Sequence, residues 1–449
     1  MDATTSRLTD FASAPLPCSP AVTHEAKRRL IDSMACALGA WHTPLCQAAR
    51  AVAGTESAEG SAALWGLARR SSPEAAAFAN GTLVRALDLS DMYRVRSGGH
   101  PSDVIAAVIA VADATRASGR DTLEAIVLAY EFYCTFCEAI DINTLGWDQP
   151  LYAAIASAAG AARVLGLRGA SMAHAISLAV APNLALAQTR RGRISSWKGA
   201  AAANAARNGV FAARLAQAGV SGPADVFEGS GGLFEALGAF DWRIGHGQPR
   251  ILSTNLKRFP VCYHGQGAAA AAIELRSQVA PQDVTGLRVD TYAQAVTYMA
   301  NEPSRWAPAT RETADHSLPY VVAVALSDGD VTEHSFDEDR LADPALQRLM
   351  ACTRVVEDEA YSARYPASAP CRLTIELRDG TARSVEVPSP EGHCDRPMSD
   401  AAVDAKFLGL AAEVIPAPAA RRLLDALWGT DQAPGIRDVL SCFPAIEGH

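Results

Sequence analysis

Alanine-rich segments with helical patterning constrain this chain more than any other feature of its sequence. Leu151 to Leu165 reads LYAAIASAAGAARVL, and the segments 171–187 and 199–219 have the same small-residue character. Alanine is the strongest helix former, and small side chains let helices approach one another closely. Gly166, directly after the first segment, is typical of a helix end. The pattern predicts a body of tightly packed helices.

Four further segments before residue 140 also predict helices. Ala26, Leu30, Met34 and Leu38 recur at helical spacing, and Asp121 is suited to an N-cap. The segment 101–118 is apolar on nearly every side and predicts a buried central helix. Up to about residue 265 we find no convincing strand-type alternation. The predicted helices of this part cover residues 20–41, 73–88, 101–118 and 121–139.

The pattern changes after residue 280. Residues 285–296 alternate in part, and 372–387 alternate clearly around the Asp379–Gly380 turn signal. Helical patterns cover 317–326 and 337–351, and helical patterning returns in 399–443. We therefore expect a mainly α protein: a large all-helical domain (1–265, with 396–449 packing back on it) and a smaller α+β lid domain (266–395).

Composition narrows the class of protein. The formal net charge of -9 argues against general nucleic-acid binding, and no run is apolar and long enough to span a membrane. Residues 1–20 lack the apolar core of a secretory signal, so we expect a cytoplasmic location and reduced cysteines. Cys134 and Cys137 form a CxxC inside a helical run without a second ligand pair, so we expect small buried side chains and no metal site there.

The segment 86–104 carries a candidate active-site corner. Asp88 and Asp91 are three residues apart at a predicted helix end, which places them on one face. His100 precedes Pro101, a residue favoured in the first turn of a helix. Free N–H groups at such a helix start attract carboxylates and phosphates. A helix–loop–helix whose polar residues only cap and solvate remains the alternative.

Three more segments gather polar side chains near predicted helix ends. Any one of them alone is as well explained by structural or solvated groups. They are 188–209 with Arg190, Arg191, Arg193 and Lys198, 256–267 with Lys257, Tyr263 and His264, and 315–320 with Tyr320.

In their residues and in their order along the chain, these segments resemble the MmgE/PrpD family. This family includes 2-methylcitrate dehydratase, cis-aconitate decarboxylase and iminodisuccinate epimerase-like members. The resemblance runs through nearly the whole chain. It is carried by AKRRLIDSMACALGAW, ALDLSDMY, HPSD, WKGAAAANAARNG, FEGSGGLFEAL, LKRFPVCYHGQG and DHSLPY.

The resemblance implies a helical domain built from both chain ends, an α+β lid and a homodimer. It implies a di- or tricarboxylate substrate, with no metal and no organic cofactor. By motif, the catalytic residues would be Asp88, His100, Lys198, Lys257 and Tyr320. The lysines would hold substrate carboxylates, Asp88 and His100 would handle protons, and Tyr320 would donate to a developing anion or leaving hydroxyl.

We add candidates for substrate contact, and two of them depart from the family pattern. Met92 stands where members often have Thr, and Gln149 stands near a position where members often have His, although Asp148 is an alternative match for that His. Met92 could line a pocket for a substrate with a different apolar branch. The candidates are Asp91, Met92, Gln149, Arg193 and His264.

The sequence therefore predicts a hydro-lyase that dehydrates a hydroxy di- or tricarboxylate resembling 2-methylcitrate. Such a reaction needs a positioned base beside the substrate carboxylate and fixed cations for the developing charge. An epimerase or decarboxylase of a related acid is the alternative within the family. A non-catalytic carboxylate-binding protein is the alternative of another class.

Overall fold

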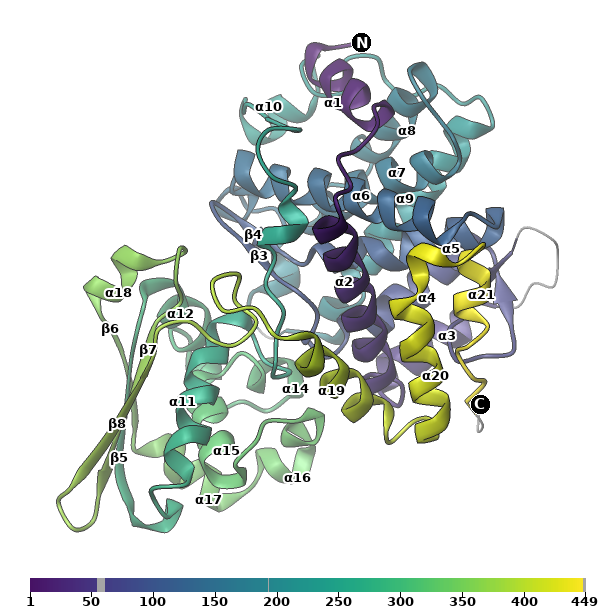
Figure 1. Cartoon of the computed structure of the whole chain (residues 1–449). Coiled ribbons are helices and arrows are strands. Elements are labelled where there is room, and N and C mark those ends of the chain that lie inside the picture. Colours follow the sequence, from purple (N-terminus) through teal and green to yellow (C-terminus); the bar gives the residue numbers. More distant parts are fainter. Residues whose placement is uncertain (55–60, 193, 447–449) are drawn as a thin grey trace.

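The computed structural model describes residues 1–54, 61–192 and 194–446. A larger helical part and a smaller part built around a sheet lie side by side (Figure 1). Over the described ranges the chain is mainly helical, with a small mixed sheet in its C-terminal region, so the predicted fold class is confirmed. Within those ranges, no helix combines the length and the apolar character needed to cross a bilayer.

The helical part is formed mostly by the first half of the chain. Its α-helices are α1 (Ala3–Ser13), α2 (Pro20–Gly39), α3 (Pro44–Val52), α4 (Pro73–Arg85), α5 (Ile105–Thr115), α6 (Gly119–Ala139), α7 (Pro150–Val164), α8 (Ala170–Val180), α9 (Ala201–Gln217) and α10 (Leu233–Leu237). Its 3-10 turns are η1 (Pro101–Val104), η2 (Ile142–Leu145), η3 (Ala187–Arg190), η4 (Ser196–Gly199) and η5 (Arg250–Ser253).

Side-chain caps set several of the helix starts. Ser19 accepts a hydrogen bond from Val22 N at the start of α2, with Pro20 as the first helical residue. The predicted cap of α6 is wrong, because the helix begins earlier, at Gly119. Ser118 is the cap, and its Oγ accepts the N–H of Asp121 at 3.1 Å.

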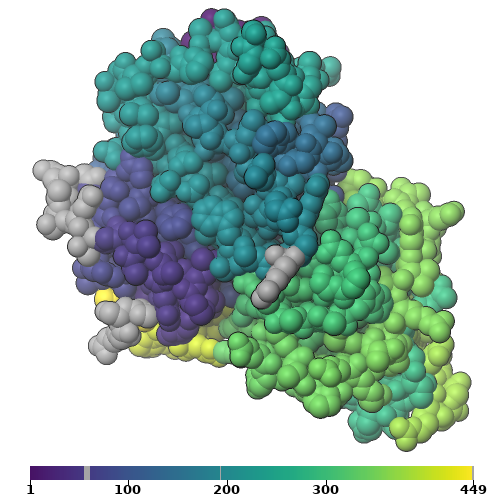
Figure 2. All heavy atoms as spheres, turned by 180° about the vertical axis from the view of Figure 1, so that it is seen from behind, coloured from purple at the N-terminus to yellow at the C-terminus, as the bar shows by residue number. Residues whose placement is uncertain are grey.

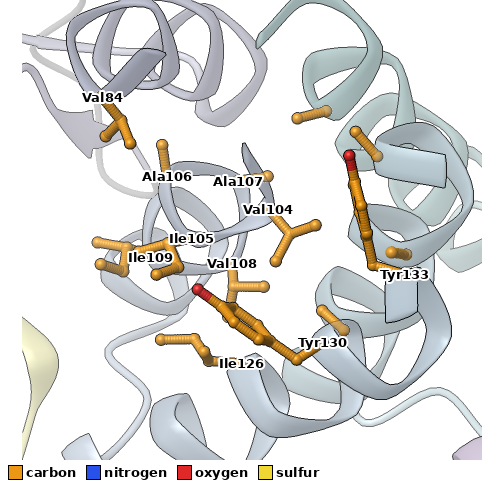
Figure 3. Close-up of a cluster of buried hydrophobic side chains, with 14 of the residues drawn as sticks. Val84, Val104, Ile105, Ala106, Ala107, Val108, Ile109, Ile126, Tyr130 and Tyr133 are labelled. Atoms are coloured by element: carbon orange, nitrogen blue, oxygen red, sulfur yellow. The ribbon is translucent and has the colours of Figure 1, made fainter. Parts of the chain in front are cut away.

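Small residues bring the central helices close together, as the alanine-rich segments predicted. A Cβ on Gly209 of α9 would lie 2.4 Å from Ala154 O of α7, so only glycine fits there. The segment predicted as one helix over 101–118 is instead η1 followed by α5. Figure 3 shows Val104 and Val108 facing Tyr130 and Ile126 of α6 in this core.

Two ladders of two residues each, which the sequence did not predict, interrupt the helical part. Strand β1 (Ala62–Ala63) pairs with β2 (Arg70–Ser71), and β3 (Tyr93–Arg94) pairs with β4 (Gly98–Gly99), both antiparallel. The second ladder lies between α4 and η1 in the chain and shapes the loop that carries the candidate residues.

The sheet of the smaller part has the strand order β6-β5-β7-β8. Strand β5 (Val284–Thr291) runs parallel to β6 (Thr353–Glu357) and antiparallel to β7 (Cys371–Leu377), which pairs with β8 (Ala382–Val387). The sequence predicted the β7–β8 hairpin but not the short, half-exposed β6. The other elements are η6 (Tyr263–Gly265), α11 (Gln266–Arg276), η7 (Pro281–Asp283), α12 (Ala293–Met299), α13 (Pro303–Trp306), α14 (Arg311–Ala314), α15 (Leu318–Asp328), η8 (Glu333–Phe336), α16 (Glu338–Leu341), α17 (Pro344–Ala351) and α18 (Glu359–Arg364).

The last helices return to the helical part. They are α19 (Asp400–Ala411), α20 (Ala417–Trp428), η9 (Thr430–Gln432) and α21 (Ile436–Leu440). Helices α19 and α20 pack on α2, and the yellow C-terminal residues lie beside the purple N-terminal ones in Figures 1 and 2. One hydrophobic core draws on residues 8–256 and 398–440, and a second on 259–387. The cores divide between residues 256 and 259 and between 387 and 398, and the domain boundaries at 265 and 395 stay a prediction.

Candidate active site

Asp88 lies at the centre of a cluster of buried charges where the helical part meets the sheet part. It follows α4 by three residues and has a φ of 52°, a left-handed conformation that is unusual for a residue other than glycine. Its carboxylate lies 2.6 Å from Lys257 Nζ and 2.9 Å from Lys198 Nζ. Arg85 Nη1 lies 3.1 Å away. Three cations from separate segments therefore converge on one carboxylate.

These cations fix the charge state of Asp88. Burial alone would raise the pKa of Asp88, but the charges of Arg85, Lys198 and Lys257 outweigh it and hold the pKa well below its usual range. Burial lowers the pKa of Lys257, against the opposing charge of Asp88. Asp88 therefore remains a carboxylate that holds the cations in place.

His100 is held in one orientation by both ring nitrogens. Nδ1 lies 2.6 Å from the carbonyl oxygen of Asp91, so this nitrogen carries the proton and donates it. Nε2 then accepts from Arg85 Nη2 at 2.8 Å. Burial, followed by the charges of Arg85 and Lys257, holds the pKa of His100 well below its ordinary value. The neutral ring has its basic nitrogen at the pocket.

Asp91 faces away from this pocket. Its Oδ1 accepts from Ser102 N at 2.9 Å and its Oδ2 accepts from Tyr130 Oη at 2.8 Å, and the side chain is fully buried. Helix α4 ends at Arg85, so the expected common face for Asp88 and Asp91 is wrong. The helix-start anion site predicted beside His100 is also wrong for an outside ligand, because Asp91 already occupies it.

His316 completes the cluster from the sheet part. Its Nδ1 contacts the carboxylate of Asp315, and its Nε2 lies 3.5 Å from Asp88 Oδ2. Burial and Lys198 lower the pKa of His316, but the contacts with Cys262 and Asp315 outweigh them and raise it above its ordinary value. The sequence singled out DHSLPY but assigned its role to Tyr320, so His316 was missed.

The structure does not bring Tyr320 to the cluster. It is buried in α15 within the core of the sheet part, and its hydroxyl donates to Ser335 O at 2.6 Å. That hydrogen bond uses the donor that the resemblance assigned to catalysis.

A cavity of about 350 Å³ opens beside the cluster. Of the predicted residues, it is lined by Asp88, His100, Lys257, Met92, Gln149 and His264. Lys198 reaches Asp88 without lining the cavity, and Arg193 lies outside the described residues. Arg85, Arg94 and His316 also line it and were not predicted as site residues. Arg190, which was noted in the basic segment 188–209 without an assigned role, lines it as well. Among the described lining residues, cationic side chains outnumber carboxylates, which suits an anionic ligand.

His264 forms part of an aromatic wall of this cavity. Its Nδ1 is hydrogen-bonded to Tyr292 Oη at 2.8 Å, and its ring stacks on Tyr298. Burial and the charge of Arg94 hold the pKa of His264 well below its ordinary value. His264 therefore contributes a neutral ring to the cavity.

Lys406 supports the cluster from outside the cavity, and the sequence analysis did not predict it. It belongs to α19, and its Nζ donates to Asp32 Oδ1 at 2.5 Å, Lys257 O at 2.8 Å and Leu89 O at 3.1 Å. One ammonium thus ties the loops that carry Asp88 and Lys257.

The donor set at Asp88 fits an ammonium better than a metal ion. Asp88, Asp315 and His316 have ligand atoms close enough together to share a cation. Lys198 Nζ already lies 2.9 Å from Asp88 and 3.3 Å from Asp315, and supplies that charge. The geometry therefore favours chemistry by protein side chains.

Comparison with known proteins agrees with this organisation. The family model for the MmgE/PrpD N-terminal domain matches residues 6–243, and the model for the C-terminal domain matches 259–431. A 2-methylcitrate dehydratase of Cupriavidus necator is 29% identical, over 82% of this chain and 81% of its own. One from Escherichia coli is 27% identical over the same shares. A cis-aconitate decarboxylase-like protein of Aspergillus oryzae is 26% identical over 97% of this chain and 95% of its own.

Proposed function

The chain belongs to the MmgE/PrpD family, and from that premise we propose that it is a hydro-lyase acting without a cofactor. Its substrate would be a hydroxy di- or tricarboxylate resembling 2-methylcitrate. One observation carries the proposal: His100 and His316 lie at one cavity with their pKa values displaced in opposite directions. Such a pair suits a base and an acid acting at the same pH.

The inner cations would hold one carboxylate of the substrate. Lys257 and Arg85 line the cavity beside Asp88, and a carboxylate that approaches Arg85 competes for the guanidinium that now donates to His100. That competition would free Nε2 of His100. The buried charges of this cluster are preorganised, so they stabilise developing negative charge without reorganisation.

The reaction then needs two proton transfers. His100 Nε2 takes the proton from the carbon next to the held carboxylate, and the C–H electron pair forms the new double bond. The C–O bond breaks, and the hydroxyl leaves as water with the proton of His316. Exchange with solvent returns His100 to its neutral form and His316 to its charged form.

The experiment is direct. Purified protein is mixed with 2-methylcitrate, citrate and a panel of related hydroxy acids, and double-bond formation is followed by ultraviolet absorbance and NMR. We expect turnover of at least one acid, and loss of turnover in both His100→Asn and His316→Asn. Folded wild-type protein that converts none of them would contradict the proposal.

A decarboxylase is the second candidate. The Aspergillus relative, which covers nearly all of this chain, is described as cis-aconitate decarboxylase-like. The same cations would stabilise the carbanion left when carbon dioxide departs. Carbon dioxide release without water loss would favour it, and deuterium exchange alone would favour an epimerase. Tight binding without turnover would favour a binding protein, although that role gives no reason for two oppositely tuned histidines. A homodimer and a cytoplasmic location remain predictions.

A further inference from the structure

Buried hydrogen-bond donors without partners gather at a second place in the same cavity. Gln149 is 5% exposed, and its Nε2 has no hydrogen-bond partner among the described residues. The buried Nη2 of Arg190 and Nε of Arg94 likewise have no hydrogen-bond partner among the described residues. All three side chains line the cavity. Buried donors in native proteins almost always have partners, so unpaired ones at a cavity point to a ligand that accepts.

Local contacts hold these donors in place. Arg190 Nε donates to Asp148 Oδ1 at 2.8 Å, and the same oxygen accepts from Gln149 N at 2.9 Å. Asp148 therefore joins the two residues. Within the described residues, Asp148 Oδ2 is also a buried acceptor without a partner, but the three unpaired donors outnumber it.

Gly98 and Gly99 leave the space that the side chains of Arg94 and Gln149 occupy. A Cβ on Gly99 would lie 2.6 Å from Gln149 Oε1, and a Cβ on Gly98 would lie 2.8 Å from Arg94 Nη1. The two-residue strand β4 thus lets Gln149 and Arg94 lie against neighbouring stretches of one backbone. Their placement is built into the fold and does not depend on a flexible surface loop.

We propose that Gln149, Arg190 and Arg94 form a second carboxylate subsite, separate from the cations at Asp88. A carboxylate only accepts hydrogen bonds, so it matches a group of donors better than a hydroxyl or an amide does. The subsite rests on the proposed function, in which the first carboxylate lies at Lys257 and Arg85. It restricts the substrate to acids that carry a second carboxylate able to span the cavity.

The test measures binding of acids that have no hydroxyl to eliminate. Tricarballylate, with three carboxylates, and butyrate, with one, are titrated into the wild type, Gln149→Met and Gln188→Met by calorimetry and ligand-observed NMR. Methionine keeps the length of Gln149 and removes its N–H donors. Gln188 is exposed nearby outside the cavity lining and serves as the matched control.

We expect Gln149→Met to weaken tricarballylate binding by about tenfold or more, since it removes a hydrogen bond to a charged group. Butyrate binding should stay within twofold, and Gln188→Met should match the wild type. Arg190→Lys, which keeps the charge beside Asp148 but loses Nη2, should show the same selective loss. An equal change for both acids, no change, or a wild type that does not bind tricarballylate would overturn the subsite. Because neither probe can be dehydrated, a failure of the proposed reaction leaves this readout intact.

Discussion

Lys257 donates hydrogen bonds to two oxygens of Asp88, the carboxylate Oδ1 at 2.6 Å and the main-chain carbonyl at 2.7 Å. One ammonium thus fixes both the side chain and the backbone of a residue in the left-handed region. Because Asp88 stays ionised among its cations, its proposed role is to place charge. In the proposed reaction, the two histidines transfer the protons.

His100 should be required for turnover but not for folding. In His100→Asn the amide N–H can still reach Asp91 O, while the atom at Nε2 is lost, so we expect kcat to fall about 10²–10⁴-fold. The melting temperature should change little. His100→Gln is the matched comparison, since its amide reaches toward Nε2 and gives up the Asp91 contact. If the melting temperature of His100→Asn falls strongly instead, the loss of turnover follows from unfolding and His100 is a structural cap.

The rate should depend on pH through both histidines. The proposed reaction requires neutral His100, whose pKa lies well below the ordinary 6.5, and charged His316, whose pKa lies above it. A plot of kcat/KM against pH is therefore expected to be bell-shaped, with the acid limb below pH 6.5 and the alkaline limb above it. Asp315→Asn removes a charge that holds the proton on His316. The alkaline limb of the variant's profile should therefore shift to lower pH by roughly 1 pH unit or more. An alkaline limb that stays in place would exclude His316 as the acid.

Asp103 should make the folded protein less stable as pH rises. Burial raises the pKa of this carboxyl to about 7, and neither of its oxygens has a hydrogen-bond partner among the described residues. The unfolded chain releases the proton near pH 4, so between about pH 4 and 7 the folded state binds the extra proton. The free energy of unfolding then falls by up to about 1.4 kcal/mol per pH unit from this residue.

Asp103→Asn should flatten that dependence. Urea unfolding at pH 5 and pH 8 is compared for the wild type, Asp103→Asn and the exposed control Asp10→Asn. At pH 8, Asp103→Asn should be more stable than the wild type, and Asp10→Asn should not. Parallel behaviour of all three proteins would show that Asp103 does not titrate in this range.

Lys406 should support turnover from outside the cavity. Lys406→Met frees the carbonyls of Leu89 and Lys257 and leaves Asp32 buried without its cation, so both stability and kcat should fall. The double variant Asp32→Asn/Lys406→Met removes the buried charge as well. It should recover most of the melting temperature but not kcat, because the two loops remain untied. Full recovery of both would reduce Lys406 to a structural partner of Asp32.

Local patterns predicted the elements well. Proline at the first helical position fixed the start of α2, and the Asp379–Gly380 turn identified the β7–β8 hairpin. Strand β6 was missed because its stabilising partner, β5, lies more than sixty residues away and its own residues are only half buried. Single-sequence patterns do not carry such long-range pairings.

The candidate site was predicted unevenly for the same reason. Asp88, His100, Lys198 and Lys257 came from family motifs, and the structure brings them together. Arg85 carries no distinctive local signal, and His316 lies in the motif DHSLPY, whose role was assigned to Tyr320. The importance of both comes from where the fold directs their side chains. The orphaned donor of Gln149 is likewise a property of packing, and no spacing rule reveals it.

The tie from α19 to the Asp88 loop has a consequence for how the protein is made. A nascent chain leaves the ribosome from its N-terminus, so Lys406 emerges well after Asp88 and Lys257. While residues 258–405 are being made, the chain therefore contains Asp88 and Lys257 without the ammonium that aligns them. Activity should arise only after α19 has packed on α2, so a product that ends before Lys406 should show no turnover although it keeps both Asp88 and Lys257.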